Sequence, residues 1–441
     1  ERVFDRALAG HGQLLDISGE AGVGKSRLFA EAFPRAIERG FESYGGTCPA
    51  YGIQTPYLPW VMLFRALFGL SDGGEMAVAP EVVLTQQLTR VDPSFDAWLP
   101  LMAQFLGYAV PDTPLTAGLT PELRRQRLFD LVLSVLRARA AHTPLLLVFE
   151  DLHSADAISL EMLDYVARNI GRDPMLIVAL HRRPLQLDTW RDYDYYNQVV
   201  LDELPAQDAV ELARARLGMA EIPPALASIL LRGESRANPF FLEEMLNALI
   251  DQGYLIPRER TAGFDLVVDL ADVAVPESIQ SLVMSRIDRL DETSKLAIKV
   301  ASVVGRSFEE SLLHAIYPVA VSQAALHTSL QHLSTLDLTP LDRPAPDWEY
   351  AFRHVITQEV AYESLLYAHR QDLHHRVGEC LEQRYAGNLE EHYELLAYHF
   401  AESADKEKGW HYLLRAGDKA RQSYANESAI DFYAQALALA P

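Results

Sequence analysis

Short apolar runs alternate with amphipathic segments over the first two fifths of the chain. Three runs are apolar or nearly so: residues 14–18 (LLDIS), 145–149 (LLLVF) and 175–180 (MLIVAL). A strand that is buried on both faces carries apolar residues without alternation. Segments with helical periodicity, such as residues 123–141, lie between these runs. This alternation predicts a parallel sheet that is covered by helices on both faces.

The alternating pattern has one irregular interruption, and it changes after the third apolar run. Residues 71–121 contain scattered Pro and Gly and predict an irregular helical insertion. After residue 204 strand-like runs become rare, and helix starts are marked at Pro205, at Pro223 and at the pair Asn238-Pro239. Further helices follow from residue 275, and then comes a polar, Pro-rich stretch at 338–352 that resembles a strand pair. Helices followed by a strand pair suggest a winged helix.

The last part of the chain is helical from about residue 355 onward. Residues 429–441 (AIDFYAQALALAP) are similar to the second helix of a tetratricopeptide-type (TPR) repeat. We therefore expect an α/β P-loop NTPase domain followed by a mostly helical part, a winged helix and TPR-like helices. The expected units are residues 1–203 for the nucleotide-binding domain, 204–275 for a small helical domain, 276–354 for the winged helix and 355–441 for the helical end.

The sequence GEAGVGKS follows the first apolar run and precedes a helical segment. It matches the pattern G-x-x-x-x-G-K-[ST] in full. Gly22 and Gly24 permit turns in which successive backbone N–H groups point at phosphate oxygens. Lys25 adds a positive charge for the β- and γ-phosphates, and the Ser26 hydroxyl is suited to Mg²⁺. The predicted nucleotide-binding residues here are Gly19, Glu20, Ala21, Gly22, Val23, Gly24, Lys25, Ser26 and Arg27.

Two acidic residues directly follow the second apolar run. Glu150 is the candidate that, with Ser26, holds Mg²⁺, and Asp151 is the candidate that polarises the attacking water. Two adjacent acids on their own would be ordinary surface residues. Their position after a buried strand and downstream of a complete phosphate loop indicates a catalytic pair.

Basic residues follow the third apolar run. A cation at this strand end could sense the γ-phosphate and stabilise charge during transfer. Arg182 and Arg183 are both candidates, and spacing does not choose between them. The alternative is a solvated basic corner.

Together these motifs resemble the STAND class of AAA+-related signalling ATPases. The resemblance is closest to the ATPase module that stands beside class III adenylate and guanylate cyclase domains and in large bacterial transcriptional regulators and kinases. It covers nearly the whole chain. Seven motifs occur in the family's order: GEAGVGKSRL, FEDLHSADAISLEML, the strand-end RRP, NPFFLEEML, VPESIQSLVMSRIDRLDETSK, ASVVGRSF and FRHVITQEVAYESL.

The resemblance implies a switch in which three units clamp ADP when off and rearrange on ATP. It implies that Pro239 packs near the adenine and that His354 touches the ADP phosphate. The alternatives are a proline that only starts a helix and a core histidine. The chain departs from the family pattern at Ser154, where Trp is usual, and at Ala237, where Gly is usual. The family's Gly-Arg element upstream of the first helix is absent from this sequence.

Composition and charge exclude several kinds of partner. The formal net charge is −22, from 39 basic and 61 acidic residues. Such a surface repels phosphate backbones, so we expect no direct nucleic-acid binding by this part of the chain. The two cysteines, Cys48 and Cys380, suggest neither a disulfide framework nor a zinc site. No apolar run approaches the roughly 20 residues of a membrane span, and a cytoplasmic location fits best.

The leading interpretation is an ATP/ADP-dependent regulatory switch, a slow Mg²⁺-dependent ATPase that controls an output domain outside this chain. That output domain would be a cyclase, a kinase or a DNA-binding domain, and a nucleotide-dependent oligomer is possible. The alternatives are a turnover ATPase of the motor type and a nucleotide-binding scaffold for protein partners. The sequence names neither the inducer nor the oligomeric state.

The two ends suggest a piece of a longer polypeptide, because the chain begins with Glu1 inside a helical pattern and ends at Pro441 directly after one. Residues 418–441 predict a helix pair whose apolar face needs further stacked repeats. Tyr433 and Leu437 would then be exposed. The alternative is that the last helix packs back on the winged-helix region and buries them.

Overall fold

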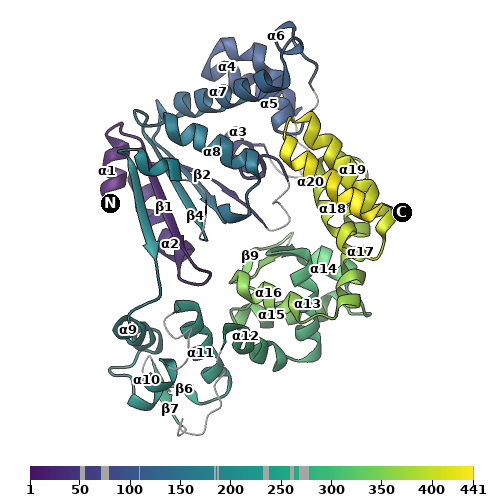
Figure 1. Cartoon of the computed structure of the whole chain (residues 1–441). Coiled ribbons are helices and arrows are strands. Elements are labelled where there is room, and N and C mark those ends of the chain that lie inside the picture. The colour runs from purple at the N-terminus through teal and green to yellow at the C-terminus, as the bar shows by residue number, and fades with distance from the viewer. Residues whose placement is uncertain are drawn as a thin grey trace.

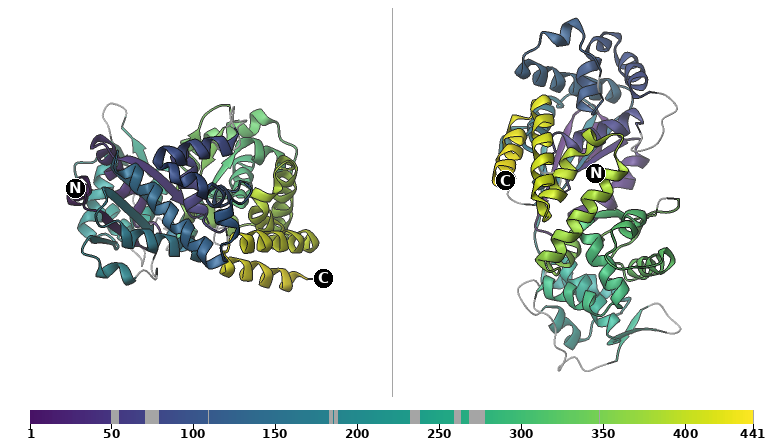
Figure 2. Two further views of the ribbon diagram at one scale, coloured as in Figure 1. Left: turned by 90° about the horizontal axis from the view of Figure 1, so that it is seen from above. Right: turned by 90° about the vertical axis from the view of Figure 1, so that its right-hand side faces the viewer.

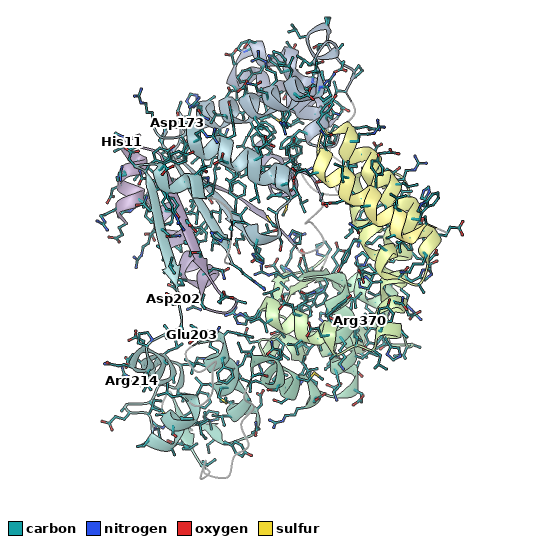
Figure 3. The ribbon with its side chains drawn as sticks, in the orientation of Figure 1. His11, Asp173, Asp202, Glu203, Arg214 and Arg370 are labelled. Carbon is teal, nitrogen blue, oxygen red and sulfur yellow. The ribbon has the colours of Figure 1, made fainter. Side chains whose placement is uncertain are left out.

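The computed structural model describes residues 1–49, 55–70, 79–108, 110–182, 185, 188–231, 238–258, 263–267, 278–346 and 348–440. An α/β domain at the N-terminus leads to a small helical unit, and a third unit and a row of helices follow (Figure 1). Asp202 and Glu203 lie in the connection that leaves the sheet and enters the second unit (Figure 3). The fold class expected from the sequence, α/β first and mostly helical afterwards, is confirmed.

The N-terminal sheet has five parallel strands in the order β2-β3-β4-β1-β5. The three central strands are those predicted from the apolar runs, and every residue of β4 is buried. The sequence did not indicate the two edge strands. The strands are β1 (Gln13–Gly19), β2 (Glu42–Thr47), β3 (Leu145–Glu150), β4 (Met175–His181) and β5 (Tyr196–Leu201).

Helices cover both faces of this sheet, as predicted. Along β3, Leu146 and Val148 belong to one apolar core, and Leu147 and Phe149 belong to the other. Successive side chains of a strand point to opposite faces, which gives this division. The first core is completed by α1 (Arg2–Leu8) and α2 (Lys25–Glu38), and the second by α3 (Leu58–Phe68), α7 (Pro121–Ala140) and α8 (Ala157–Asn169).

The predicted helical insertion is present between α3 and α7. Its described elements are α4 (Pro80–Val91), η2 (Pro93–Trp98), α5 (Leu99–Phe105) and α6 (Pro114–Ala117). Pro stands in the first turn of each of these four elements, where its missing N–H costs no hydrogen bond. Two further short elements of the α/β domain are η3 (Leu152–Ser154) and η4 (Asp188–Asp192).

The second unit, in the part that the structure describes, contains three helices and a short strand pair that the sequence did not indicate. It consists of α9 (Ala206–Leu217), α10 (Pro224–Leu230), α11 (Pro239–Asp251), β6 (Leu255–Pro257) and β7 (Phe264–Leu266). It has an apolar core of its own, to which α12 (Ile279–Asp288) of the third unit contributes Leu282. The two units are therefore packed together.

A buried ionic network also joins the second and third units. Arg286 of α12 donates two hydrogen bonds of 2.8 Å to the Glu244 carboxylate of α11 and one of 2.9 Å to the Leu336 carbonyl oxygen. Asp251 lies 3.1 Å from the same guanidinium. Removing one partner of such a buried network leaves an uncompensated charge, which costs about 3–5 kcal/mol. We infer that α11 and the third unit move together.

The third unit carries the predicted strand pair and one further strand. Its small antiparallel sheet has the order β8-β10-β9. The assignment of this unit as a winged helix stays a prediction, as do the four domain boundaries. The elements are α12 (Ile279–Asp288), α13 (Glu292–Val304), β8 (Ser307–Glu309), α14 (Glu310–Ile316), α15 (Gln323–Thr335), β9 (Leu341–Arg343), β10 (Glu349–Ala351) and α16 (Val355–Glu363).

The remaining residues form antiparallel helices that return to the α/β domain. They are α17 (Tyr367–Arg384), η6 (Leu389–His392), α18 (Tyr393–Glu402), α19 (Lys406–Gln422) and α20 (Asn426–Leu439). Figure 2 shows these helices, in yellow, alongside the α/β domain. Gln104 of the insertion donates a hydrogen bond of 3.0 Å to the carbonyl oxygen of Gln422. The helical end therefore contacts the insertion.

The two residues of the last helix that were predicted to be exposed, Tyr433 and Leu437, differ in their exposure. Leu437 is 77% exposed, as is expected of an unpaired apolar face, and Ile430 is 65% exposed. Tyr433 is half-buried, and its hydroxyl donates a hydrogen bond of 2.8 Å to Asp418 of α19. Ala429, Phe432 and Ala436 of this helix are buried, and its Tyr433 ring lies against Gly417 of α19. The outer side of α20 is thus apolar in part, and the TPR assignment stays a prediction.

A fully buried histidine pair joins α17 to α18. The Nδ1 atoms of His374 and His399 are 3.0 Å apart, and the Tyr362 hydroxyl lies 3.0 Å from the His374 Nε2 atom. Burial and, to a smaller extent, the charge of Arg370 together lower the pKa of His374 to about 4. Burial and the neighbouring His374 lower the pKa of His399 well below its usual value.

This pair predicts that the protein loses stability in mild acid. Both histidines have a lower pKa when folded than when unfolded, so the unfolded chain binds more protons between pH 6.5 and about 4. The free energy of unfolding therefore falls with falling pH in this window, by up to ~1.4 kcal/mol per pH unit for each histidine. Urea titrations between pH 7 and pH 5 measure the slope. His374→Gln should flatten it, and the exposed His411→Gln should leave it unchanged; equal slopes in both variants would contradict the prediction.

Candidate functional site

The phosphate loop joins β1 to α2 in the geometry that its glycines require. Gly22 and Gly24 have φ values of +80° and +98°, a left-handed backbone region that strongly favours glycine. Gly24 is the N-cap of α2, and its carbonyl oxygen accepts the first helical hydrogen bond, from the Leu28 N–H, at 2.8 Å. The positive end of the α2 dipole thus points toward the loop, as in an anion site.

The Lys25 amine lies along the loop. Its Nζ atom donates hydrogen bonds of 2.9 Å to the carbonyl oxygens of Gly19 and Glu20. Burial lowers the pKa of Lys25, Arg182 lowers it further, and Asp151 and Glu20 oppose both effects. Phosphate oxygens bound in this loop would be charged acceptors, and the amine would donate stronger hydrogen bonds to them than to these two carbonyl oxygens.

Ser26 and Glu150 face each other across the end of the sheet. The Ser26 Oγ atom donates to the Glu150 Oε2 atom at 3.4 Å. Burial raises the pKa of Glu150, an effect that the Arg306 charge opposes and the Asp151 charge reinforces. A hydroxyl and a carboxylate are oxygen ligands of the kind that Mg²⁺ prefers. The two side chains predicted to hold Mg²⁺ are thus together and chemically suited to it.

Asp151 follows directly after the end of β3. Its φ of +55° lies in the left-handed region, which Asp tolerates better than most residues. One carboxylate oxygen, Oδ2, accepts a hydrogen bond of 3.0 Å from the Arg306 guanidinium of the third unit. The predicted water-activating carboxylate is therefore held by a cation from the third unit.

Arg182 lies at the carboxyl end of β4, as predicted, and Arg183 lies outside the described residues. The Arg182 guanidinium is 3.3 Å from the Glu359 carboxylate of α16. The preceding His181 is buried, and its Nε2 atom lies 2.8 Å from the Asp16 carboxylate of β1. This contact fixes the strand end from which Arg182 extends.

The start of α11 touches the phosphate loop. The Asn238 side-chain amide donates a hydrogen bond of 2.9 Å to the Ala21 carbonyl oxygen, and the Phe240 N–H donates one of 3.2 Å to that of Gly22. A side chain at Gly22 would place its Cβ atom 2.8 Å from the Phe240 Cβ atom. Pro239, the predicted adenine contact, occupies the first position of this helix. The predicted site residue is therefore next to the loop.

His354 lies on the other side of Phe240. The two ring centroids are 4.2 Å apart, and the His354 Nε2 atom is 3.8 Å from the Glu243 carboxylate. Burial lowers the pKa of His354 to about 4, and the charges of Arg353 and Arg306 act in the same direction. The ring is therefore neutral at pH 7. Its predicted role as a phosphate contact stays a prediction.

Sequence reasoning missed several residues that the fold brings to this site. Asn238, Phe240 and Arg306 are within motifs that were recognised, but no local pattern showed that they meet the loop or Asp151. His153 was also missed: burial lowers its pKa, as do the charges of Arg182 and Lys25. Among the described residues its buried Nδ1 atom has no hydrogen-bond partner. The available signal was that several of the recognised motifs follow the carboxyl ends of strands, and so lie at one end of the sheet.

Comparison with known proteins finds a matching family and similar proteins. The family described as "AAA ATPase domain" matches residues 1–178. An uncharacterized protein of Rhizobium meliloti (strain 1021) is 26% identical over 387 residues, which are 87% of this chain and 36% of that protein. A STAND protein with a tetratricopeptide repeat sensor from Pyrococcus horikoshii matches with a TM-score of 0.48 and 14% identity, over 99% of this chain and 57% of that one.

The chain thus spans about a third of the curated relative and little more than half of the solved structure. No helix within the described ranges is long and apolar enough to cross a membrane. The family match covers the phosphate loop, the strand with Glu150 and Asp151, and the greater part of β4. The first 178 residues of the chain therefore resemble an AAA ATPase domain, and the predicted nucleotide-binding motifs lie largely within this matched region.

Proposed function

We propose that this chain is a slow, Mg²⁺-dependent ATPase that acts as a regulatory switch for an output domain outside it. The observation that carries the proposal is that both later units reach the phosphate site. α11 bonds to the phosphate loop through Asn238 and Phe240, and the third unit holds Asp151 through Arg306. When the other units contact the groups that bind and hydrolyse the nucleotide, hydrolysis or exchange of the nucleotide changes the position of those units.

The roles of the individual residues follow from their chemistry. The loop amides and Lys25 bind phosphate oxygens, and Ser26 and Glu150 would hold Mg²⁺, which neutralises charge that develops on the phosphates. Asp151 accepts the proton of the attacking water as the water oxygen bonds to the γ-phosphorus and the bridging bond to the β-phosphate breaks. Arg182, or Arg183, would stabilise the charge on the departing phosphate.

The remaining contacts suit a clamp around the nucleotide. Pro239 stands between the two residues that touch the loop, and the neutral His354 ring lies against Phe240. A nucleotide that binds one arrangement of the three units better than another shifts the population toward that arrangement. We propose that ADP holds the clamped arrangement and that ATP favours its release, with a cyclase, a kinase or a DNA-binding domain as the output.

Turnover kinetics distinguish this switch from a motor-type ATPase. A switch is expected to hydrolyse about one ATP per chain and retain the ADP, with steady turnover far below the ~10 s⁻¹ median of enzymes. Quenched-flow and filter-binding measurements with radiolabelled ATP determine burst size and retained ADP, with Lys25→Ala as the background control. Fast steady turnover without retained ADP would support the motor alternative, and binding without any hydrolysis would support a scaffold.

A further inference from the structure

Arg306 links the third unit to the catalytic edge of the sheet. Its guanidinium donates the 3.0 Å hydrogen bond to the Oδ2 atom of Asp151, and the two side chains are 42% and 32% exposed. Its charge also acts on Glu150 and on His354. Arg306 is therefore within the electrostatic reach of three residues that belong to the predicted nucleotide site.

The backbone of Arg306 belongs firmly to the third unit. It lies between the end of α13 and the start of β8, after Gly305, which has a φ of +149°. The Arg306 carbonyl oxygen accepts a hydrogen bond of 2.8 Å from the Phe352 N–H, next to β10. Any movement of the third unit away from the sheet therefore carries Arg306 with it and withdraws its side chain from Asp151.

A second ion pair crosses the same junction with the charges reversed. Here Arg182 comes from the α/β domain, and Glu359 comes from α16. Ion pairs of such exposure stabilise a protein only weakly. The two ion pairs therefore separate readily, as a releasable restraint requires.

We propose that Arg306 is a positioning residue that restrains ATP hydrolysis by occupying the Asp151 carboxylate. While the pair is formed, the carboxylate is turned toward the guanidinium, and a positive charge stands beside the group that must accept a proton from water. Withdrawal of the third unit frees Asp151 to orient the water. This inference rests on the proposed function, because it needs a chain that binds and hydrolyses ATP.

Single-turnover hydrolysis with enzyme in excess tests the restraint. Arg306→Ala is expected to raise the rate about two- to fivefold, since the loss of one weak ion pair corresponds to at most about a fivefold change. Arg306→Lys should stay near the wild-type rate. Arg343→Ala, which removes an exposed arginine whose partner Glu349 is within the same unit, should leave the rate unchanged. An unchanged or slower rate in Arg306→Ala would overturn the proposal; a slower rate would mean that Arg306 stabilises the transition state.

A charge reversal provides a readout that does not depend on activity. Small-angle scattering of the nucleotide-free chain should show a larger radius of gyration for Arg306→Glu, which sets two carboxylates against each other. The double variant Asp151→Asn with Arg306→Glu, which removes this repulsion and keeps a residue that tolerates the φ of +55° at position 151, should restore the wild-type value. A wild-type radius for Arg306→Glu, or no recovery in the double variant, would overturn the proposed pairing. Should Arg306→Ala fail to fold by circular dichroism, Arg306→Gln and this scattering series decide the question.

Failure of the inference and failure of the proposed function give different results. Calorimetry with ADP establishes binding by the wild-type chain and by Arg306→Ala, which should agree within about threefold. If neither chain binds nucleotide, the proposed function fails. If both bind and Arg306→Ala hydrolyses ATP no faster, only the restraint is wrong.

Discussion

Lys25→Ala is expected to weaken ATP and ADP binding by about 10²-fold or more while the fold stays intact. The Lys25 side chain is outside the apolar cores, and among the described residues its amine donates hydrogen bonds to two loop carbonyls. Its loss therefore removes a charged phosphate contact and no packing. A charge-assisted contact to phosphate contributes about 3 kcal/mol, which corresponds to a factor of about 10² in affinity.

Calorimetry with MgATP and with ADP measures this effect, and thermal melting followed by circular dichroism monitors the fold. Lys406→Ala is a matched control, because Lys406 is also the first residue of a helix and its amine also donates to a backbone carbonyl, that of Ala401. That variant should bind nucleotide normally. Undiminished affinity in Lys25→Ala would show that the loop does not bind phosphate.

Asp151→Asn is expected to keep nucleotide binding and to slow hydrolysis by about 10²-fold or more. The amide cannot accept the proton of the attacking water, and general-base catalysis contributes factors of about this size. Asn is the suitable replacement because the residue has a φ of +55°, a conformation that Asn tolerates and Ala does not tolerate well. A backbone change is thereby avoided.

Single-turnover rates with radiolabelled ATP decide this prediction. Glu161→Gln is the control. Glu161 belongs to the same domain, lies 3.0 Å from the Arg125 guanidinium and is 49% exposed, against 32% for Asp151. It should hydrolyse ATP at the wild-type rate. If Asp151→Asn did so as well, Asp151 would be no base, and its pairing with Arg306 would have no catalytic consequence.

The sequence by itself determined the centre of the sheet and the chemistry of the phosphate loop. The central strands β1, β3 and β4 are predictable because burial on both faces demands a continuous apolar run. The loop is predictable because its glycines, its lysine and its serine act within eight consecutive residues, where spacing and geometry are directly linked. The acidic pair at the end of β3 follows from the same rule, since the carboxyl ends of parallel strands meet at one edge.

The edge strands and the interdomain contacts were decided only by the tertiary structure. β2 (ESYGGT) and β5 (YNQVVL) each have a neighbouring strand on one side only and retain polar or glycine residues, so no apolar run marks them. Asn238 meets Ala21, and Arg306 meets Asp151, across more than 150 positions of sequence. Such pairs depend on how α11 and the third unit pack against the sheet, and no local spacing encodes that packing.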